Sequence, residues 1–261
     1  MTLKPNDFEG ISDTDFPYYT KSYIIDEDNI IFYGRTGTSS TSTGKYIIYN
    51  LPSKKITLNR TIPNTQGEIL EMAYDNDTGL CLAISQGTDG HKYIYYTTNI
   101  SDPSSWQKYL YQNDSGYGSS YTKKDIGSLY FYKGQWNLIA YRDKTVYFAM
   151  STNPISAENW AEFVVVETNS ACSGVCRYVN NQYFVKVTLW SSGDSGWDKD
   201  GSTTYNSNNG TVWQKTSLKD FSDLTYANGT YYAANEKYIY TFTDVLATDM
   251  QSFYFSLSSG Y

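Results

Sequence analysis

The fold is decided by a segment that first reads KYIIY at residues 45–49 and then recurs along the chain as KYIYY at 92–96, KTVYF at 144–148 and KYIYT at 237–241. Each copy is a lysine followed by aromatic and β-branched residues, which fit the pleated surface of a sheet, so each predicts a β-strand. The lysines are 47, 52 and 93 residues apart. Because the last spacing is close to two periods, it predicts one further copy in between.

A second recurrence supplies that missing copy. Upstream of each segment lies a turn rich in Asn, Asp or Gly between two runs of alternating apolar residues. These residue types tolerate the positive φ that a two-residue hairpin turn requires. Five such turns predict five repeats, and they lie at 26–29, 76–79, 133–134, 180–181 and 228–229.

Each repeat predicts four short strands, a pattern that at a period of roughly 40 to 50 residues is typical of a β-propeller blade. We therefore predict an all-β chain, a five-bladed β-propeller with four antiparallel strands per blade and a short N-terminal arm. A β-sandwich or two small β domains are the alternative, which the constant period disfavours. The predicted strands are 223–226, 230–234, 237–243 and 252–256 in the last repeat, and 128–132, 135–141, 145–151 and 161–167 in the third.

The predicted domain organisation follows from the same period. The arm spans residues 1–16 and a single propeller spans residues 17–261. The sequence leaves open whether the ring closes by packing of its first and last blades or by a strand from the arm. The blades are expected at about 17–65, 66–115, 116–168, 169–216 and 217–261.

Composition excludes several functions. With 20 Lys and Arg against 27 Asp and Glu, the net charge is −7, which argues against nucleic-acid binding. Even the longest purely aliphatic runs, such as residues 164–166, are too short to span a bilayer, so we expect no membrane insertion. A single histidine excludes a His-based metal cluster. We expect no metal and no cofactor. Cys81, Cys172 and Cys176 are interpreted as small buried hydrophobes.

Loops before the predicted fourth strand end on tryptophan in three repeats, at Trp106, Trp160 and Trp213. The last loop, SNNGTVW at 207–213, resembles the Asp-box, Ser-x-Asp-x-Gly-x-x-Trp, of sialidase-like propellers. In that family the Ser and Asp bond the loop backbone and the Trp packs between blades, so the resemblance implies fold rather than activity. All copies are degenerate. The last lacks the spacer residue between Asn209 and Gly210, and the first, at residues 101–106, has Pro103 in place of the variable residue.

Catalytic constellations are incomplete in this sequence, and we predict no catalytic residue. A sialidase-like site needs three arginines that clamp a carboxylate, and the chain has four arginines at unlike blade positions, Arg35, Arg60, Arg142 and Arg177. A glycoside hydrolase needs two carboxylates that flank the scissile bond. Asp125 and Asp223, at the starts of predicted innermost strands, are the remaining candidates. A glycoside hydrolase or sialidase-like enzyme is thus the alternative.

The fourth repeat carries an unusual segment between its second and third strands. Residues 190–201 place two Trp and three Asp in a Gly/Ser frame and are interpreted as a long loop. A Trp face can stack on a sugar ring, and Asp can accept hydrogen bonds from its hydroxyls. The alternative is that Trp190 packs in the core and Trp197 folds over the blade edge. The predicted ligand-binding residues are Trp190, Asp194, Trp197, Asp198 and Asp200, with Tyr117 and Tyr121 of a second Tyr/Ser/Gly-rich loop.

These observations predict a non-enzymatic recognition or assembly module. Low Pro content, no apolar secretory signal and strands rich in Tyr, Asn, Thr and Ser resemble bacteriophage virion proteins of the tail, fibre or head decoration. The resemblance implies a virion protein made in the host cytoplasm, with residues 1–16 docked on other virion proteins and a host surface glycan as ligand. A purely structural assembly protein is the further alternative.

Overall fold

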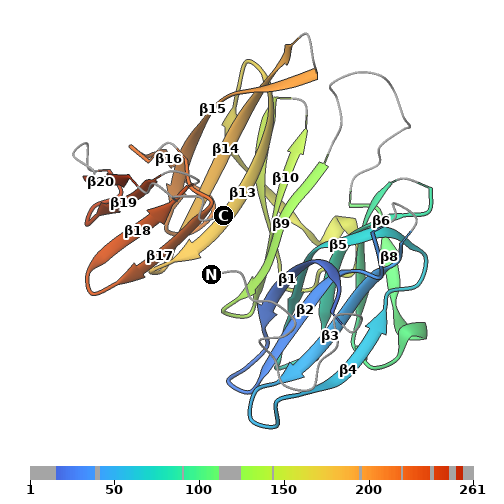
Figure 1. Cartoon of the computed structure of the whole chain (residues 1–261). Helices are drawn as coiled ribbons and strands as arrows, with labels where there is room; N and C mark the ends of the chain where they lie inside the picture. Colours follow the sequence, from blue (N-terminus) through green and yellow to red (C-terminus); the bar gives the residue numbers. More distant parts are fainter. Residues whose placement is uncertain are drawn as a thin grey trace, which may run out of the picture. The chain divides into compact units, whose positions relative to one another are not determined.

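The computed structural model is all β apart from short turns (Figure 1). Within the part of the chain that it describes, the only helical segments are two 3₁₀ turns, Pro103–Ser105 and Ala157–Asn159. The described residues are 16–38, 42–89, 91–111, 125–142, 144–193, 196–218, 220–235, 238–246 and 251–254.

The strands form five four-stranded sheets, each built from consecutive strands. The first contains β1 (Tyr18–Ile24), β2 (Asn29–Arg35), β3 (Gly44–Asn50) and β4 (Lys55–Thr61). The second contains β5 (Thr65–Tyr74), β6 (Cys81–Gly87), β7 (Lys92–Thr97) and β8 (Gln107–Tyr109). The third contains β9 (Asp125–Tyr132), β10 (Gln135–Arg142), β11 (Thr145–Ser151) and β12 (Ala161–Glu167).

The fourth sheet contains β13 (Ala171–Val179), β14 (Gln182–Gly193), β15 (Gly196–Ser207) and β16 (Gln214–Lys215). The fifth contains β17 (Asp223–Ala227), β18 (Thr230–Ala234), β19 (Tyr238–Phe242) and β20 (Gln251–Tyr254). The predicted five-bladed β-propeller with four antiparallel strands per blade is confirmed. Residues 1–15 of the predicted arm lie outside the described residues, and Phe16 is buried against Phe32 of the first blade, with ring centroids 5.0 Å apart.

The hairpin turns explain why the sequence period predicts the blades. Between the first two strands of the third, fourth and fifth blades, both turn residues have positive φ. This backbone matches the right-handed twist of the strands that it joins, and Asn and Gly adopt it at little cost. The three predicted turns are therefore confirmed: φ is 49° and 74° at Lys133 and Gly134, 50° and 59° at Asn180 and Asn181, and 50° and 81° at Asn228 and Gly229.

The predicted long loop at 190–201 is wrong. β14 and β15 contain 12 residues each, and they pair from Tyr183 with Ser207 as far as Gly193 with Gly196. The segment is rich in Ser, Gly and Asp, so it lacks the apolar alternation that signals a strand. It forms a strand because its backbone pairs with the neighbouring strand, and such pairing leaves no apolar alternation in the sequence.

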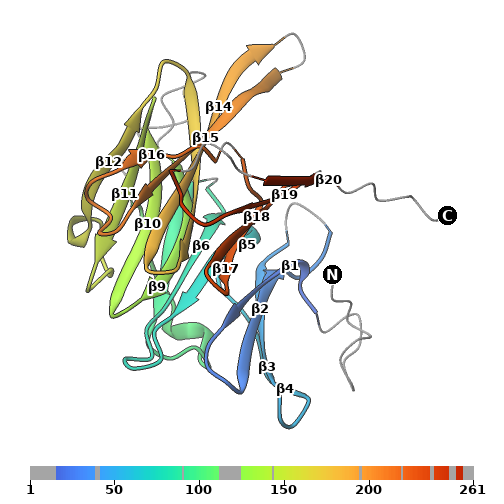
Figure 2. The ribbon, with the colours of Figure 1, turned by 90° about the vertical axis from the view of Figure 1, so that its left-hand side faces the viewer.

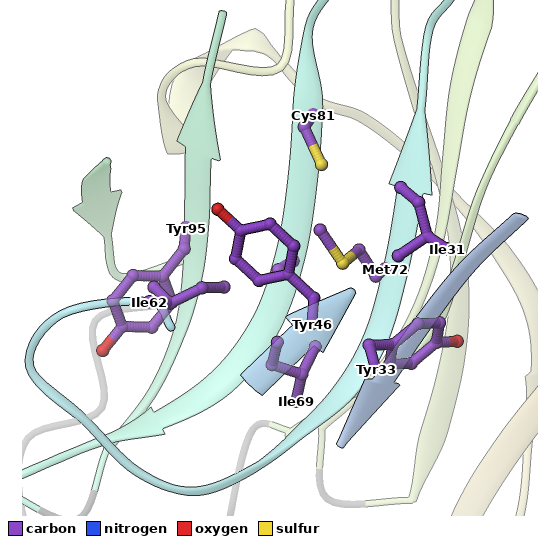
Figure 3. Close-up of a cluster of buried hydrophobic side chains, with 9 residues drawn as sticks. Ile31, Tyr33, Tyr46, Ile62, Ile69, Met72, Cys81 and Tyr95 are labelled. Atoms are coloured by element: carbon purple, nitrogen blue, oxygen red, sulfur yellow. The ribbon is translucent and has the colours of Figure 1, made fainter. Parts of the chain in front are cut away.

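The chain divides into two compact units. One comprises residues 1–115, 129–138 and 150–161, and the other comprises residues 116–128, 139–149 and 162–261. In the first unit, a core between the first two blades surrounds the fully buried Tyr46, which Figure 3 shows amid Met72, Cys81 and Ile31. In the second unit, Phe184 of β14 packs into a core formed mainly by the fifth blade, including Tyr231 and Phe242.

All three cysteines are buried and none of them forms a disulfide, so the interpretation as small buried hydrophobes is confirmed. Burial strongly raises the pKa of the Cys81 thiol, which favours its neutral form.

Tryptophans of the loops before the fourth strands brace neighbouring blades. Trp106 Nε1 donates to the Tyr46 hydroxyl over 3.2 Å, and this hydroxyl donates to the Ile100 carbonyl over 2.7 Å. Trp160 repeats the arrangement one blade further on. Its Nε1 donates to the Tyr109 hydroxyl over 2.9 Å, and that hydroxyl donates to the Pro154 carbonyl over 2.7 Å. We call each such pair a Trp–Tyr brace.

The third loop tryptophan reaches the preceding blade by ring packing. The Trp213 ring lies 5.2 Å from that of Phe148 on β11, centroid to centroid. Its loop is held from within, because Ser207 Oγ accepts from the Gly210 amide over 2.9 Å and Asn209 Oδ1 accepts from the Thr211 amide over 3.0 Å. In all three loops the tryptophan therefore contacts an aromatic residue of the blade before it.

A Tyr46→Phe substitution tests the brace. It leaves the Trp106 N–H and the Ile100 carbonyl without their shared partner, so we expect a loss of about 1 to 3 kcal/mol in the free energy of unfolding at neutral pH. Urea titration measures it. The exposed Tyr232 provides a matched Tyr→Phe control, which should change the free energy of unfolding little.

The same variant changes the response to alkali. Burial raises the pKa of Tyr46 from 10.0 to about 12, against the opposing Trp106 hydrogen bond. The folded state therefore retains a proton that the unfolded chain loses, and this contribution to stability is complete below pH 10 and disappears as the pH rises to about 12. Unfolding free energies across this range should fall less steeply for Tyr46→Phe. Equal slopes for variant and parent would contradict the assignment.

Candidate functional site

The distal part of the β14–β15 hairpin is the site candidate. β13 pairs with β14 only up to Ala171 and Trp190. β16 pairs with β15 only at Tyr205 and Asn206. Past these points the two strands continue together as a ribbon (Figures 1 and 2). Because a two-stranded ribbon is only marginally stable in water, this extension adds little to the stability of the blade. We call residues 190–193 and 196–201 the distal hairpin.

A β-bulge lies at the base of the distal hairpin. Leu189 pairs with Gly201 but Trp190 pairs with Lys199, so Asp200 is the extra residue. Gly201 has φ of +140°, a conformation that L side chains rarely adopt, and the Asp200 carboxylate accepts from Ser191 Oγ over 2.8 Å. Bulges re-aim the side chains beside them and interrupt the edge that another strand would join. The geometry thus favours recognition by side chains over addition of a strand.

The two faces of the fourth blade differ in chemistry. One is apolar, with Cys176 beside Val185 and Gly174 beside Val187. It contacts the third blade so closely that a Cβ at Gly174 would lie 2.8 Å from Ile139 Cγ2, so glycine is required there. The opposite face has the cross-strand rows Ala171–Trp190–Lys199 and Ser173–Thr188–Ser202. We call the residues Ser173, Thr188, Trp190, Lys199 and Ser202 the Trp190 face.

The hydroxyl of Ser173 holds the Trp190 ring. Trp190 is half-buried, and its Nε1 donates to Ser173 Oγ over 3.0 Å. In the same row of hydroxyls, Thr188 Oγ1 and Ser202 Oγ are 3.4 Å apart. The face therefore combines part of an aromatic surface with groups that can both donate and accept hydrogen bonds.

Asp220 ties the Trp190 face to the segment that precedes the fifth blade. Its Oδ2 lies 2.8 Å from Lys199 Nζ and its Oδ1 lies 3.2 Å from Lys186 Nζ. Lys186 Nζ also donates to the Phe221 carbonyl over 2.6 Å. Burial raises the pKa of Asp220, but hydrogen bonds from the two lysines outweigh it and hold the pKa below the ordinary value. The Lys199 side chain is thereby fixed beside Trp190.

Of the predicted ligand-binding residues, Trp190 and Asp200 lie together at the base of the distal hairpin. The backbones of Trp197 and Asp198 pair with Ser192 and Ser191, and their side chains lie outside the described part. Asp194, Tyr117 and Tyr121 lie outside the described residues altogether. Sequence reasoning missed Ser173, Thr188, Lys199, Ser202 and Asp220. Thr188 and Trp190 are two residues apart, so in a strand their side chains lie on the same face. This spacing would have indicated the Trp190 face if residues 190–201 had been predicted as strand.

The two acids considered for hydrolysis each begin the first strand of a blade. Asp125 begins β9 and Asp223 begins β17, and each carboxylate accepts from the next amide, of Ile126 over 2.8 Å and of Leu224 over 2.9 Å. Burial raises the pKa of Tyr141, and the Asp125 carboxylate beside it adds to that effect. Asp223 lies 3.8 Å from Arg177 Nε with its side chain 80% exposed.

All four arginines have partners within the chain. The Arg35 guanidinium lies 4.3 Å from the centre of the Tyr19 ring, and Arg142 pairs with Glu162. Arg60 Nε donates to the Ser101 carbonyl over 3.1 Å, and Arg177 Nη1 donates to the Cys176 carbonyl over 3.0 Å. A carboxylate clamp built from these side chains would have to replace these contacts.

No helix among the described residues is long and apolar enough to cross a membrane. In the same part of the chain, no three His, Cys, Asp or Glu residues gather as a metal site would require.

Comparison with known proteins identifies the fold alone. No protein-family model matches the chain, and no curated protein matches its sequence. Among solved structures, a subtype N11 neuraminidase-like protein of A/flat-faced bat/Peru/033/2010 (H18N11) aligns with a TM-score of 0.58 at 12% identity, over 97% of this chain and 76% of that one. At this identity the likeness shows the β-propeller fold and leaves the activity open.

Two further structures are less similar. The arabinanase Arb43A of Bacillus subtilis aligns with a TM-score of 0.46 at 14% identity, over 94% of this chain and 96% of that one. The endosialidase of phage phi92 aligns with a TM-score of 0.43 at 11% identity, over 82% of this chain and 42% of that one.

An Asp220→Asn substitution tests the anchoring of the Trp190 face. It removes the charge that two lysines share while keeping the side-chain shape. Because the Lys186 side chain is only 16% exposed, we expect a loss of about 1 to 3 kcal/mol in the free energy of unfolding, measured in urea. Asp77→Asn, at an exposed turn position, is the matched control. An Asp220→Asn variant as stable as the control would show that the ion pairs contribute nothing.

Proposed function

We propose that this chain is a non-enzymatic recognition module of a virion, such as a tail, fibre or decoration component, and that it binds a host surface glycan through the distal hairpin. The observation that carries the proposal is the continuation of β14 and β15 past their sheet with Trp190 beside a row of hydroxyl side chains. Rigid scaffolds commonly present binding residues on such extensions.

The chemistry of the Trp190 face suits a sugar. Pyranose rings have apolar C–H patches that pack on indole, and their hydroxyls both donate and accept hydrogen bonds. Ser173 and Ser202 offer the same dual capacity, and Lys199 adds a donor, while the buried Thr188 hydroxyl lies 3.4 Å from that of Ser202. The indole is already oriented by its bond to Ser173, so little conformational freedom is lost on binding.

The blade plan supports a likeness to sialidase-like propellers, because Ser207 and Asn209 bond their loop backbone and Trp213 packs on the preceding blade. The composition supports placement in a virion. We propose that residues 1–16 dock on a neighbouring virion protein. Since Phe16 is buried in the chain's own first blade, residues 1–15 would make that contact.

Binding of full-length protein to an array of bacterial surface glycans tests the proposal. Trp190→Ala should lower affinity for the bound glycan at least tenfold, about 1.4 kcal/mol. Trp190→Phe, which keeps a ring, should retain part of the binding, and Tyr232→Ala on β18 is an aromatic control at a different site. Urea titration of each variant separates lost binding from lost folding.

Two outcomes would contradict the proposal. Release of reducing sugar that disappears in Asp125→Asn or Asp223→Asn would identify a glycoside hydrolase. Absence of binding to every glycan, with attachment to a partner virion protein abolished by deletion of residues 1–15, would identify a purely structural assembly protein.

A further inference from the structure

The charged groups described on and beside the Trp190 face do not cancel. Lys186 and Lys199 contribute two positive charges, and the carboxylate of Asp220, which contacts both, contributes one negative charge. The two lysines differ in their access to solvent. Lys186 Nζ also donates to the Phe221 carbonyl and its side chain is only 16% exposed, whereas the Lys199 side chain is 45% exposed. The surplus positive charge is therefore accessible at Lys199.

Asp200 does not cancel this surplus charge. Its carboxylate accepts from Ser191 Oγ, and Ser191 alternates with Trp190 along β14, so the carboxylate belongs to the opposite face of the hairpin. The chain as a whole has a net charge of −7, but at physiological salt charges more than about 8 Å away are largely screened. A ligand on the Trp190 face therefore interacts mainly with the charge of Lys199.

Lys199 lies directly across from Trp190. The two residues form a cross-strand pair, which places their Cβ atoms about 4.5 to 5.5 Å apart on one face of the hairpin. The edge of a sugar ring packed on the indole is therefore within reach of the Lys199 ammonium group. This group has three N–H donors, and its described contacts use one of them, in the 2.8 Å bond to Asp220.

The remaining donors of this face suit a carboxylate. A hydrogen bond from an ammonium group to a carboxylate is about twice as strong as one between neutral groups. Ser173 Oγ accepts from the Trp190 indole, which leaves its hydroxyl proton for a ligand. One surplus positive charge balances one carboxylate, whereas a phosphate ester, with a charge of about −1.5 to −2 at neutral pH, would leave negative charge in excess.

We propose that the Trp190 face selects sugars that carry a carboxylate, such as a hexuronic acid, and that Lys199 determines this specificity. The inference rests on the proposed function and names its ligand class. The indole packs on the sugar ring, while the Lys199 ammonium group and the Ser173 hydroxyl donate to the carboxylate. Complementary charge of this kind discriminates between ligands, because a ligand without the carboxylate leaves the lysine unpaired.

The experiment compares three forms of each oligosaccharide in an immobilised panel. One form ends in a hexuronic acid, the second in its carboxyl-reduced neutral counterpart and the third in a sugar phosphate. Binding of the full chain is measured at low and at physiological salt. We expect the carboxylated form to bind at least tenfold more tightly than the other two, with a smaller ratio at higher salt because screening weakens the attraction.

Variants of Lys199 test its role. Lys199→Gln removes the charge but keeps a hydrogen-bond donor, so it should lower binding of the carboxylated form at least tenfold and change binding of the reduced form little. Lys199→Arg keeps the charge and should keep the preference. Lys215→Gln is the matched control, since Lys215 is an exposed residue of β16 in the same blade and pairs with Tyr205. Urea titration shows whether each variant is folded.

The outcomes separate the inference from the function beneath it. Equal or tighter binding of the reduced form would overturn the selectivity and leave glycan recognition standing. Tightest binding of the phosphate form would overturn the assignment to a carboxylate. A preference for the carboxylated form that Lys199→Gln leaves unchanged would overturn the role of Lys199. If folded protein binds no member of the panel, the proposed function fails together with the inference.

Discussion

The structure depends on contacts between each blade and the one before it, and the Trp–Tyr brace is the most specific of these. A four-stranded sheet cannot bury both faces alone, so a propeller blade needs its neighbours. Trp106 and Tyr46 join blades through a hydrogen bond as well as through ring packing. Trp160 donates a hydrogen bond to Tyr109, and its ring packs on that of Tyr111. Each hydroxyl also bonds a loop carbonyl, so that one tyrosine orders both a blade and the next loop.

The fourth blade follows this plan on one face and departs from it on the other. Its apolar face packs against the third blade, where Gly174 allows close approach to Ile139. On the opposite face, Phe184 packs in the core with the fifth blade. Further along β14, the residues on this face are Thr188 and Trp190. A polar row there adds little to packing between blades. Along this one strand the side chains therefore change from ones that pack between blades to polar ones that add little to that packing.

The sequence predicts the fold well because the blade signals are local. Hairpin turns such as Asn228-Gly229 and segments such as 45–49 depend on residues adjacent in the chain. The site is harder to predict, because the strand conformation of Ser191 comes from pairing with a partner rather than from apolar alternation. The bond between Lys199 and Asp220 joins residues far apart in sequence, and no short pattern indicates it. Trp190 was found because tryptophan in a polar segment is conspicuous whatever its conformation.

We propose above all that a glycan binds on the Trp190 face. Nuclear magnetic resonance of ¹⁵N-labelled protein during titration with an oligosaccharide that the array identifies as bound tests it most directly, since the indole N–H of Trp190 and the amides of Ser173, Thr188 and Ser202 each report on this face. If the glycan binds there, these signals shift together and saturate at a common ligand concentration. Shifts centred on Asp125 or Asp223, with the Trp190 indole unmoved, would contradict it.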